Sequence, residues 1–196
     1  MEIVLSAFLG LGLSAAVGFR IFVPFFIASI AAYTGNLTLS ESFTWIGSMP
    51  AMIMFGVATI FEIGAYYIPW LDNLLDTVST PIAVIAGSIL TASTMFELDP
   101  ALKWPIAIIA GGGTAGLIHG LTSSVRLGST ATTGGIANPA VSTVETGGSI
   151  LLSLLAIAVP VLAFVLVLVL ILFLFKKAKK LGVALFRKKS TSITNQ

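Results

Sequence analysis

The chain has 196 residues, of which 57% are hydrophobic and 9% are charged, and its mean hydropathy is +1.06. An ordinary soluble domain is about 25% charged, so this composition excludes a water-exposed fold and predicts an all-α bundle of transmembrane helices. Seven of the ten basic residues follow Phe175, which argues against nucleic-acid binding, and the absence of cysteine excludes disulfides, thiolate metal sites and cysteine nucleophiles.

The first predicted span, residues 3–33, carries Arg20 as its one charged residue and is longer than a single bilayer crossing requires. Pro24 removes a backbone donor one turn after Arg20, which predicts a kink or break at that point. We place Arg20 about midway along this segment. An arginine at bilayer depth costs about 2.5–3.5 kcal/mol even on a lenient scale, so its side chain must face protein or water.

Residues 37–47 predict a short interfacial segment, and the second span follows at residues 49–68, with Ser48 as its cap and Pro50 in its first turn. Glu62 lies inside this span and is the acidic counterpart of Arg20. The two side chains either neutralise each other or line a path for a charged solute. Asp72 and Asp76 follow on one face of a short amphipathic turn, residues 71–77, where they form either a solvated interface or a cation-collecting pair.

The third and fourth spans are predicted at residues 77–96, opened by Pro81, and 104–125, where His119 is the one titratable group. His119 either packs in the interior or relays protons. Small residues recur every four positions in the first and fourth spans, which predicts seams of close helix packing. They are Gly10, Ser14 and Gly18, and then Gly112, Gly116, Gly120 and Ser124. Residues 12–17 also resemble 120–125, and an arginine follows each, which suggests two related halves.

A neutral stretch crowded with glycine, serine and threonine, residues 128–139, precedes the last span and is either an external loop or an anion or headgroup cradle. The cradle would use Arg126, Ser129, Thr130 and Asn138, with Asn138-Pro139 as the start of a helix. Ser142 and Glu145 match a capping box, which predicts a helix start near Thr143. The last span is placed at residues 148–175, where Pro160 can bend it.

The basic tail, residues 176–196, predicts a cytoplasmic C-terminus that contacts anionic lipid headgroups. Counting back gives about five crossings, or six with a broken or re-entrant segment, and an outward N-terminus. Residues 1–175 then form a single transmembrane domain.

The sequence resembles a known family at three places. These are the run of residues 12–20 with Pro24, then Glu62 before Pro69 and Asp72, and then the segment 129–135 with Asn138-Pro139 and Glu145. The family is one of small polytopic bacterial inner-membrane proteins catalogued as a domain of unknown function. The resemblance implies one multi-pass domain in the bacterial inner (plasma) membrane. Family members often show an acidic pair where this chain has Glu145-Thr146.

Three functions are compatible with this pattern, and the first is a transporter or channel for a small solute or ion. Its path would be lined by Arg20, Glu62, His119, Thr133, Gly134, Gly135 and Asn138. The second is a lipid-handling protein that holds a headgroup at Arg126, and the third is an assembly partner of other membrane proteins, including copies of itself. An enzyme is the least favoured class, and the sequence calls for no cofactor and no metal.

Overall fold

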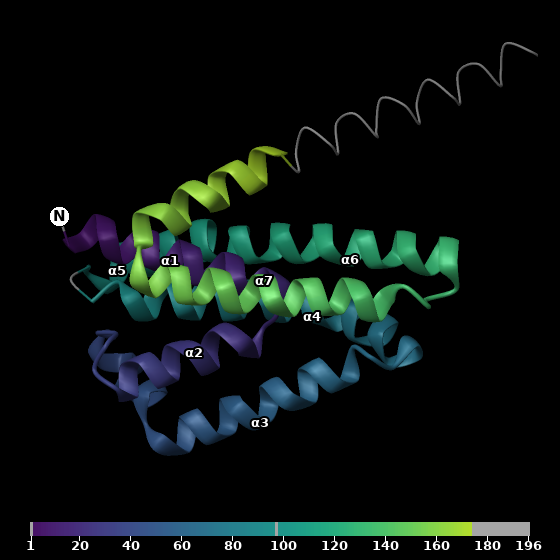
Figure 1. Cartoon of the computed structure of the whole chain (residues 1–196). Helices are drawn as coiled ribbons and strands as arrows, with labels where there is room; N and C mark the ends of the chain where they lie inside the picture. The colour runs from purple at the N-terminus through teal and green to yellow at the C-terminus, as the bar shows by residue number, and fades with distance from the viewer. Residues whose placement is uncertain (1, 97, 174–196) are drawn as a thin grey trace, which may run out of the picture.

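A computed structural model of the chain describes residues 2–96 and 98–173, and the basic tail lies outside them. Every regular element in this part of the chain is helical, which confirms the predicted all-α class (Figure 1). In chain order the helices are α1 (Glu2–Phe19), α2 (Phe22–Tyr33), the 3₁₀ helix η1 (Glu41–Gly47), α3 (Met49–Ala65), α4 (Pro69–Thr94), α5 (Pro100–Ile106), the π-helix η2 (Ala107–Gly112), α6 (Gly113–Thr133), α7 (Asn138–Ala158) and a helix over Pro160–Phe173.

Several of these helices are long and apolar enough to cross a bilayer. They are α1, the 34-residue run of α5, η2 and α6, and α7, while η1 and α3 make a fourth candidate that is bent by 64°. Three shorter apolar helices accompany them: α2, the Val78–Thr94 part of α4, and Pro160–Phe173. The chain is therefore an integral membrane protein.

The first predicted span is a helical hairpin. α1 ends at Phe19, and α2 runs back toward the end of the molecule where α1 begins (Figure 1). Asn36 and Leu37, which follow α2, lie beside Glu2 and Leu5 around one cavity. The break predicted near Arg20 is confirmed, but Arg20 occupies the hairpin tip. Because α1 rises by about 27 Å, near the thickness of a hydrocarbon core, Arg20 lies close to the far end of a crossing and not midway along it.

The last predicted span also divides into two helices that run in opposite directions. α7 ends at Ala158, and the helix that begins at Pro160 turns back along α1, where the rings of Phe8 and Phe164 stack 4.1 Å apart. α7 begins at Asn138 with Pro139 in its first turn, so the capping box predicted at Ser142 is wrong. The predicted neutral loop shortens to residues 134–137, which begin with two glycines of positive φ.

Some of the other helix boundaries lie where the sequence predicts them, and some do not. The cap of α3 is confirmed, since Ser48 Oγ accepts a hydrogen bond of 3.3 Å from the Ala51 amide. α4 begins at Pro69 and continues through Pro81, so the predicted amphipathic turn forms its first part. α6 continues past residue 125 and ends at Thr133. The next residue, Gly134, has the left-handed conformation that commonly ends a helix, and the chain reverses direction there.

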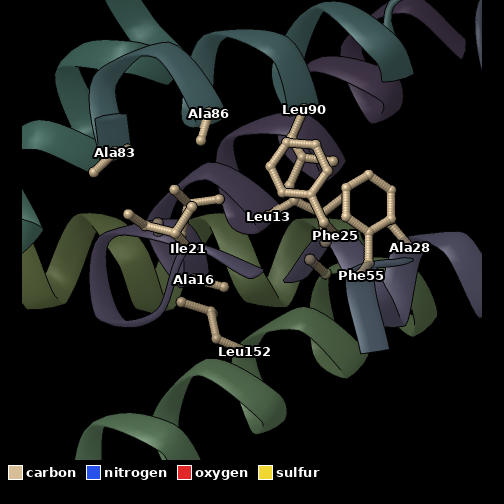
Figure 2. Close-up of a cluster of buried hydrophobic side chains, with 14 of the residues drawn as sticks. Leu13, Ala16, Ile21, Phe25, Ala28, Phe55, Ala83, Ala86, Leu90 and Leu152 are labelled. Atoms are coloured by element: carbon tan, nitrogen blue, oxygen red, sulfur yellow. The ribbon is translucent and has the colours of Figure 1, made fainter. Parts of the chain in front are cut away.

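α1 is the central helix and packs against α4, α6 and α7, whereas α2 and α3 form an outer layer (Figure 1). Figure 2 shows the apolar side chains between these layers, with Leu13 of α1 close to Phe25 of α2 and Leu90 of α4. Leu152 of α7 approaches the same cluster from the opposite side. The α1–α2 hairpin thus packs against α4, α7 and α3.

The small-residue stripe predicted on α1 packs closely where α1, α4 and η2 meet, and we call this contact the glycine seam. A Cβ atom at Gly111 would lie 2.9 Å from the Gly87 carbonyl oxygen, and one at Gly87 would lie 3.1 Å from the Gly111 carbonyl oxygen. Ser14 donates to the Gly111 carbonyl, and Thr91 donates to the Gly10 carbonyl at 3.1 Å. The seam does not reach Gly120 as predicted, because a Cβ atom added there would have no neighbour within 4 Å.

Candidate functional site

A buried charged cluster lies where α1 ends, and it contains two arginines that face one carboxylate. Arg20 Nη2 is 3.5 Å from Glu145 Oε2, and Arg126 Nε is 3.4 Å from Glu145 Oε1. Arg20 and Arg126 are each 1% exposed and Glu145 is 3% exposed. Each guanidinium therefore approaches a different oxygen of the same carboxylate, out of contact with solvent.

Tyr66, which follows α3, contacts both arginines through its ring. The guanidinium carbon of Arg20 is 3.9 Å from the centre of the Tyr66 ring, and that of Arg126 is 4.4 Å from it. A cation over an aromatic face is attracted by the ring quadrupole, more strongly when the pair is desolvated. The Tyr66 hydroxyl lies 3.4 Å from Ser79 Oγ on α4. We call Arg20, Arg126, Glu145 and Tyr66 the two-arginine cluster.

α7 supplies the polar partners of Arg20. Arg20 Nε donates to Thr146 Oγ1 at 3.1 Å, and Nη2 donates to the Ser142 hydroxyl and to the Ser142 carbonyl oxygen at 3.2 Å. Ser142 belongs to a buried polar stripe that repeats every three or four residues, the spacing of one helix face. The stripe consists of Asn138, Ser142, Glu145, Ser149 and Ser153.

Glu62 on α3 binds the backbone at the hairpin tip. Its carboxylate accepts hydrogen bonds of 2.7 Å from the Ile21 amide and 2.9 Å from the Phe22 amide. In an unbroken helix these amides would bond to carbonyls one turn earlier, so the break leaves them in need of an acceptor. A carboxylate also suits the positive end of the α2 dipole. Glu62 interacts electrostatically with both arginines, yet the partner that Arg20 contacts is Glu145, not the predicted Glu62.

His119 approaches the hairpin tip from α6. Its Nδ1 atom is 3.3 Å from the Gly18 carbonyl oxygen, and the side chain is 1% exposed. Within the described part of the chain, the buried Nε2 atom of His119 and the buried Oγ of Ser123 have no hydrogen-bond partner. His119, Ser123 and Arg126 lie three or four residues apart, so they share the face of α6 that points toward α1.

The structure brings together four of the predicted site residues and separates the others. Arg20, Glu62, His119 and Arg126 meet at the hairpin tip. Thr133, Gly134 and Gly135 lie at the turn between α6 and α7, about 10 Å along the helix from Arg126. Arg126 belongs to a helix and points into the cluster, so the predicted loop cradle with Ser129 and Thr130 does not form around it. Asn138 instead donates to Thr130 Oγ1 at 2.9 Å and ties α7 to α6.

The side chains of the predicted Asp72 and Asp76 pair lie outside the part of the chain that the structure describes. Sequence reasoning also missed three further members of this site. The missed residues are Tyr66, Ser142 and Thr146, and Glu145 was assigned to a helix cap. The polar stripe of α7 carried the necessary signal, because a helix with a regular polar face in an apolar chain must bury that face against polar partners.

A groove of about 410 Å³ opens between α6 and α7 and reaches the cluster at Glu145. Apart from Glu145 and Thr122 its lining is apolar, with Phe19, Val125 and Val144 among the residues that form it. Among the side chains that the structure describes, no three histidine or acidic groups converge to hold a metal ion.

Comparison with known proteins gives one assignment. No curated protein and no solved structure matches the chain. Residues 7–180, which include every member of the site, match the profile of a family described as a domain of unknown function, DUF4126. This match covers most of the chain and agrees with the resemblance seen in its motifs. The chain is thus a member of the DUF4126 family.

Proposed function

We propose that this protein transports a small anionic solute across the membrane and that the solute binds at the two-arginine cluster. The observation that carries the proposal is the convergence of Arg20 and Arg126, from different helices, on the two oxygens of Glu145. Two guanidiniums around one carboxylate are the donors that recognise a carboxylate or phosphate. In this proposal Glu145 occupies the position that the solute takes when it binds.

The burial of three ionic groups at one place supports a binding role for the cluster. Arg20, Arg126 and Glu145 are each at most 3% exposed. Removing charges from water costs several kcal/mol for each ion, and this cost is recovered only through close, well-satisfied pairs. Buried ionic groups in a membrane protein commonly mark a functional site.

The hairpin tip supports the same interpretation. Irregular backbone inside a membrane domain is tolerated where it is buried in protein or lines a cavity, and broken helices commonly supply binding sites in transporters. Here the break presents two backbone donors to Glu62, next to the arginines. The site therefore combines helix ends with side-chain charge.

In this proposal the structure is a closed state, which the almost complete burial of the cluster supports. Opening requires an element that can move, and α3 fits this role since it packs mainly on α2 and η1 and leaves Ile60 and Phe61 more than 70% exposed. α3 carries Glu62 and leads directly into Tyr66. Movement of α3 would withdraw both side chains from the arginines and give the solute access.

We place the protein in a bacterial inner membrane, with the basic tail in the cytoplasm. The basic residues after Phe175 support this orientation, since such clusters resist translocation. Fusion of a reporter to each terminus tests it, and an external signal from the C-terminal fusion would contradict it.

Uptake of radiolabelled phosphate, bicarbonate, acetate, sulfate and chloride into proteoliposomes tests the transport proposal. We expect the full chain to move at least one of these anions faster than empty liposomes do, and Arg20→Met and Arg126→Met each to abolish that uptake. Lys103→Met is the matched control, because Lys103 is a buried cation that donates to Ser40 Oγ at the opposite end of the bundle. Folded, monodisperse protein that moves none of the anions would contradict the proposal.

A second candidate function, lipid handling, is favoured by the groove between α6 and α7. The groove has the apolar lining that an acyl chain requires, and it ends at the charged cluster. Mass spectrometry of the purified protein would then find a copurified phospholipid, which Val144→Trp would displace by filling the groove. Protein free of lipid, with Val144→Trp indistinguishable from wild type, would reject this candidate.

A further inference from the structure

The hairpin tip contains buried polar atoms that the fold itself leaves without a hydrogen bond. Within the described part of the chain these include Arg20 Nη1, His119 Nε2 and Ser123 Oγ. Arg20 and His119 are each 1% exposed and Ser123 is 9% exposed. Buried polar groups are nearly always hydrogen-bonded in native proteins, so a set of such atoms in one place indicates a missing ligand or water.

These three atoms belong to one region. His119 contacts the carbonyl oxygen of Gly18, two residues before Arg20, and its ring interacts electrostatically with both arginines. Ser123 lies one turn after His119 on the same face of α6, and Arg126 follows on that face. The orphan atoms therefore belong to the two segments that meet at the two-arginine cluster, the hairpin tip and the buried face of α6.

The contact with Gly18 determines what His119 offers to a ligand. A carbonyl oxygen can only accept a hydrogen bond, so Nδ1 must carry the hydrogen. In the neutral imidazole ring the other nitrogen, Nε2, then has a lone pair and accepts. Arg20 Nη1 can only donate, and the Ser123 hydroxyl can do either. The region thus presents a cationic donor and a buried acceptor together.

From this arrangement we infer that the transported solute is an oxyanion that carries its own O–H group, such as bicarbonate or a protonated phosphate. This inference rests on the proposed transport function and narrows its substrate class. The charged oxygen of the solute binds Arg20, and its O–H group donates to His119 Nε2, with Ser123 adding a third hydrogen bond. An anion without a hydrogen atom leaves the His119 lone pair buried and unsatisfied, which a polar site discriminates against.

Phosphate and sulfate are matched probes, because they have the same tetrahedral shape and similar size, while near neutral pH phosphate retains an O–H group and sulfate does not. Binding is measured on the purified full chain by calorimetry, and uptake is measured in proteoliposomes. We expect phosphate to bind at least about tenfold more tightly than sulfate. Bicarbonate and nitrate form a second, planar pair with the same difference, and the preference should follow the O–H group in both pairs.

His119→Asn is the decisive variant. The asparagine amide nitrogen occupies the position of Nδ1 and can still donate to the Gly18 carbonyl, but the variant lacks Nε2. We expect it to lose the preference for phosphate over sulfate while it retains anion binding. Ser123→Ala, which removes only a hydroxyl, should reduce the preference in the same direction. Ser124→Ala is the control, since Ser124 is exposed and donates to the Gly120 carbonyl at 2.7 Å.

Equal binding of phosphate and sulfate by the wild-type chain would overturn the inference and assign the orphan atoms to buried water. A preference that His119→Asn and Ser123→Ala both leave unchanged would overturn it as well. In either case continued uptake of both anions, abolished by Arg20→Met, would leave the proposed transport function standing. Loss of all anion uptake in the wild-type chain would instead contradict transport itself.

Discussion

The glycine seam and the two-arginine cluster both bury polar atoms, but they do so in opposite ways. In the seam, hydroxyl groups donate to backbone carbonyls of the adjacent helix, as Thr91 does to Gly10, and the helices approach until a methyl group no longer fits. In the cluster, two guanidinium groups face the carboxylate of Glu145, and Arg20 Nη1 has no hydrogen-bond partner within the described residues.

This difference separates structure from function within one helix. α1 contributes Ser14 to the seam, and Arg20, at the hairpin tip to which it leads, contributes to the cluster. Close, satisfied contacts stabilise a membrane bundle by packing and hydrogen bonding. Full charges of similar burial are costly and are retained where a ligand or a conformational change uses them. The comparison therefore predicts that the seam controls assembly and that the cluster controls activity.

Gly111→Leu should produce the largest loss of stability. A side chain at this position meets Thr91 and the backbone of Gly87, so the two helices must separate, and overpacking of this kind costs about 3 kcal/mol or more. We expect loss of the monodisperse peak in size-exclusion chromatography. The control is Gly113→Leu, two residues later, where nothing lies within 4 Å of the added atom. Similar behaviour of the two variants would contradict the seam.

Arg20→Met should cost about 3 kcal/mol of stability, because it takes a cation away from Glu145 inside the protein. Adding Glu145→Gln should recover part of this loss, since the carboxylate charge goes as well. Thermal unfolding of the two single variants and the double variant measures the coupling between the residues. Strictly additive losses would show that the two side chains do not interact.

Glu62→Gln should cost about 1–2 kcal/mol, because a neutral amide accepts the two backbone hydrogen bonds at the hairpin tip less well than a carboxylate. Glu41→Gln, at an exposed position in η1, is the matched control and should leave the unfolding temperature unchanged. An equal decrease in the unfolding temperature of both variants would show that Glu62 does not stabilise the helix break.

Ser149→Ala should have the smallest effect, about 1 kcal/mol, through loss of the hydrogen bond that Ser149 Oγ donates to the Ala16 carbonyl at 2.9 Å. Uptake of anions should remain at the wild-type level, because Ser149 lies outside the cluster. A loss of uptake with stability unchanged would extend the functional region along α7.

Local chemistry allowed part of this fold to be predicted. A proline one turn after Arg20 and a serine before Met49 each determine a backbone event within a few residues, and both events are present. The direction of the chain after Pro24 or Pro160 depends on which helices pack together, which a proline does not encode. For this reason two predicted single spans are pairs of helices that run in opposite directions.

The candidate site was only partly predictable for a related reason. Arg20 and Glu62 stand out as charges in apolar segments, whereas Glu145 lies in a stretch whose local pattern resembles a helix cap. Because α7 begins at Asn138, Glu145 lies inside the helix and belongs to its polar stripe, not to a cap. The partner of Arg20 was therefore misassigned because the helix boundary was misplaced.

The most direct test of the central claim is the affinity of the purified chain for phosphate before and after Glu145→Gln. If Glu145 holds the position of the solute, removing its charge takes away an internal competitor, and phosphate should bind at least about tenfold more tightly, a gain of about 1.4 kcal/mol. Unchanged or weaker binding in the folded variant would contradict the account, because Glu145 would then be a fixed structural partner of the arginines.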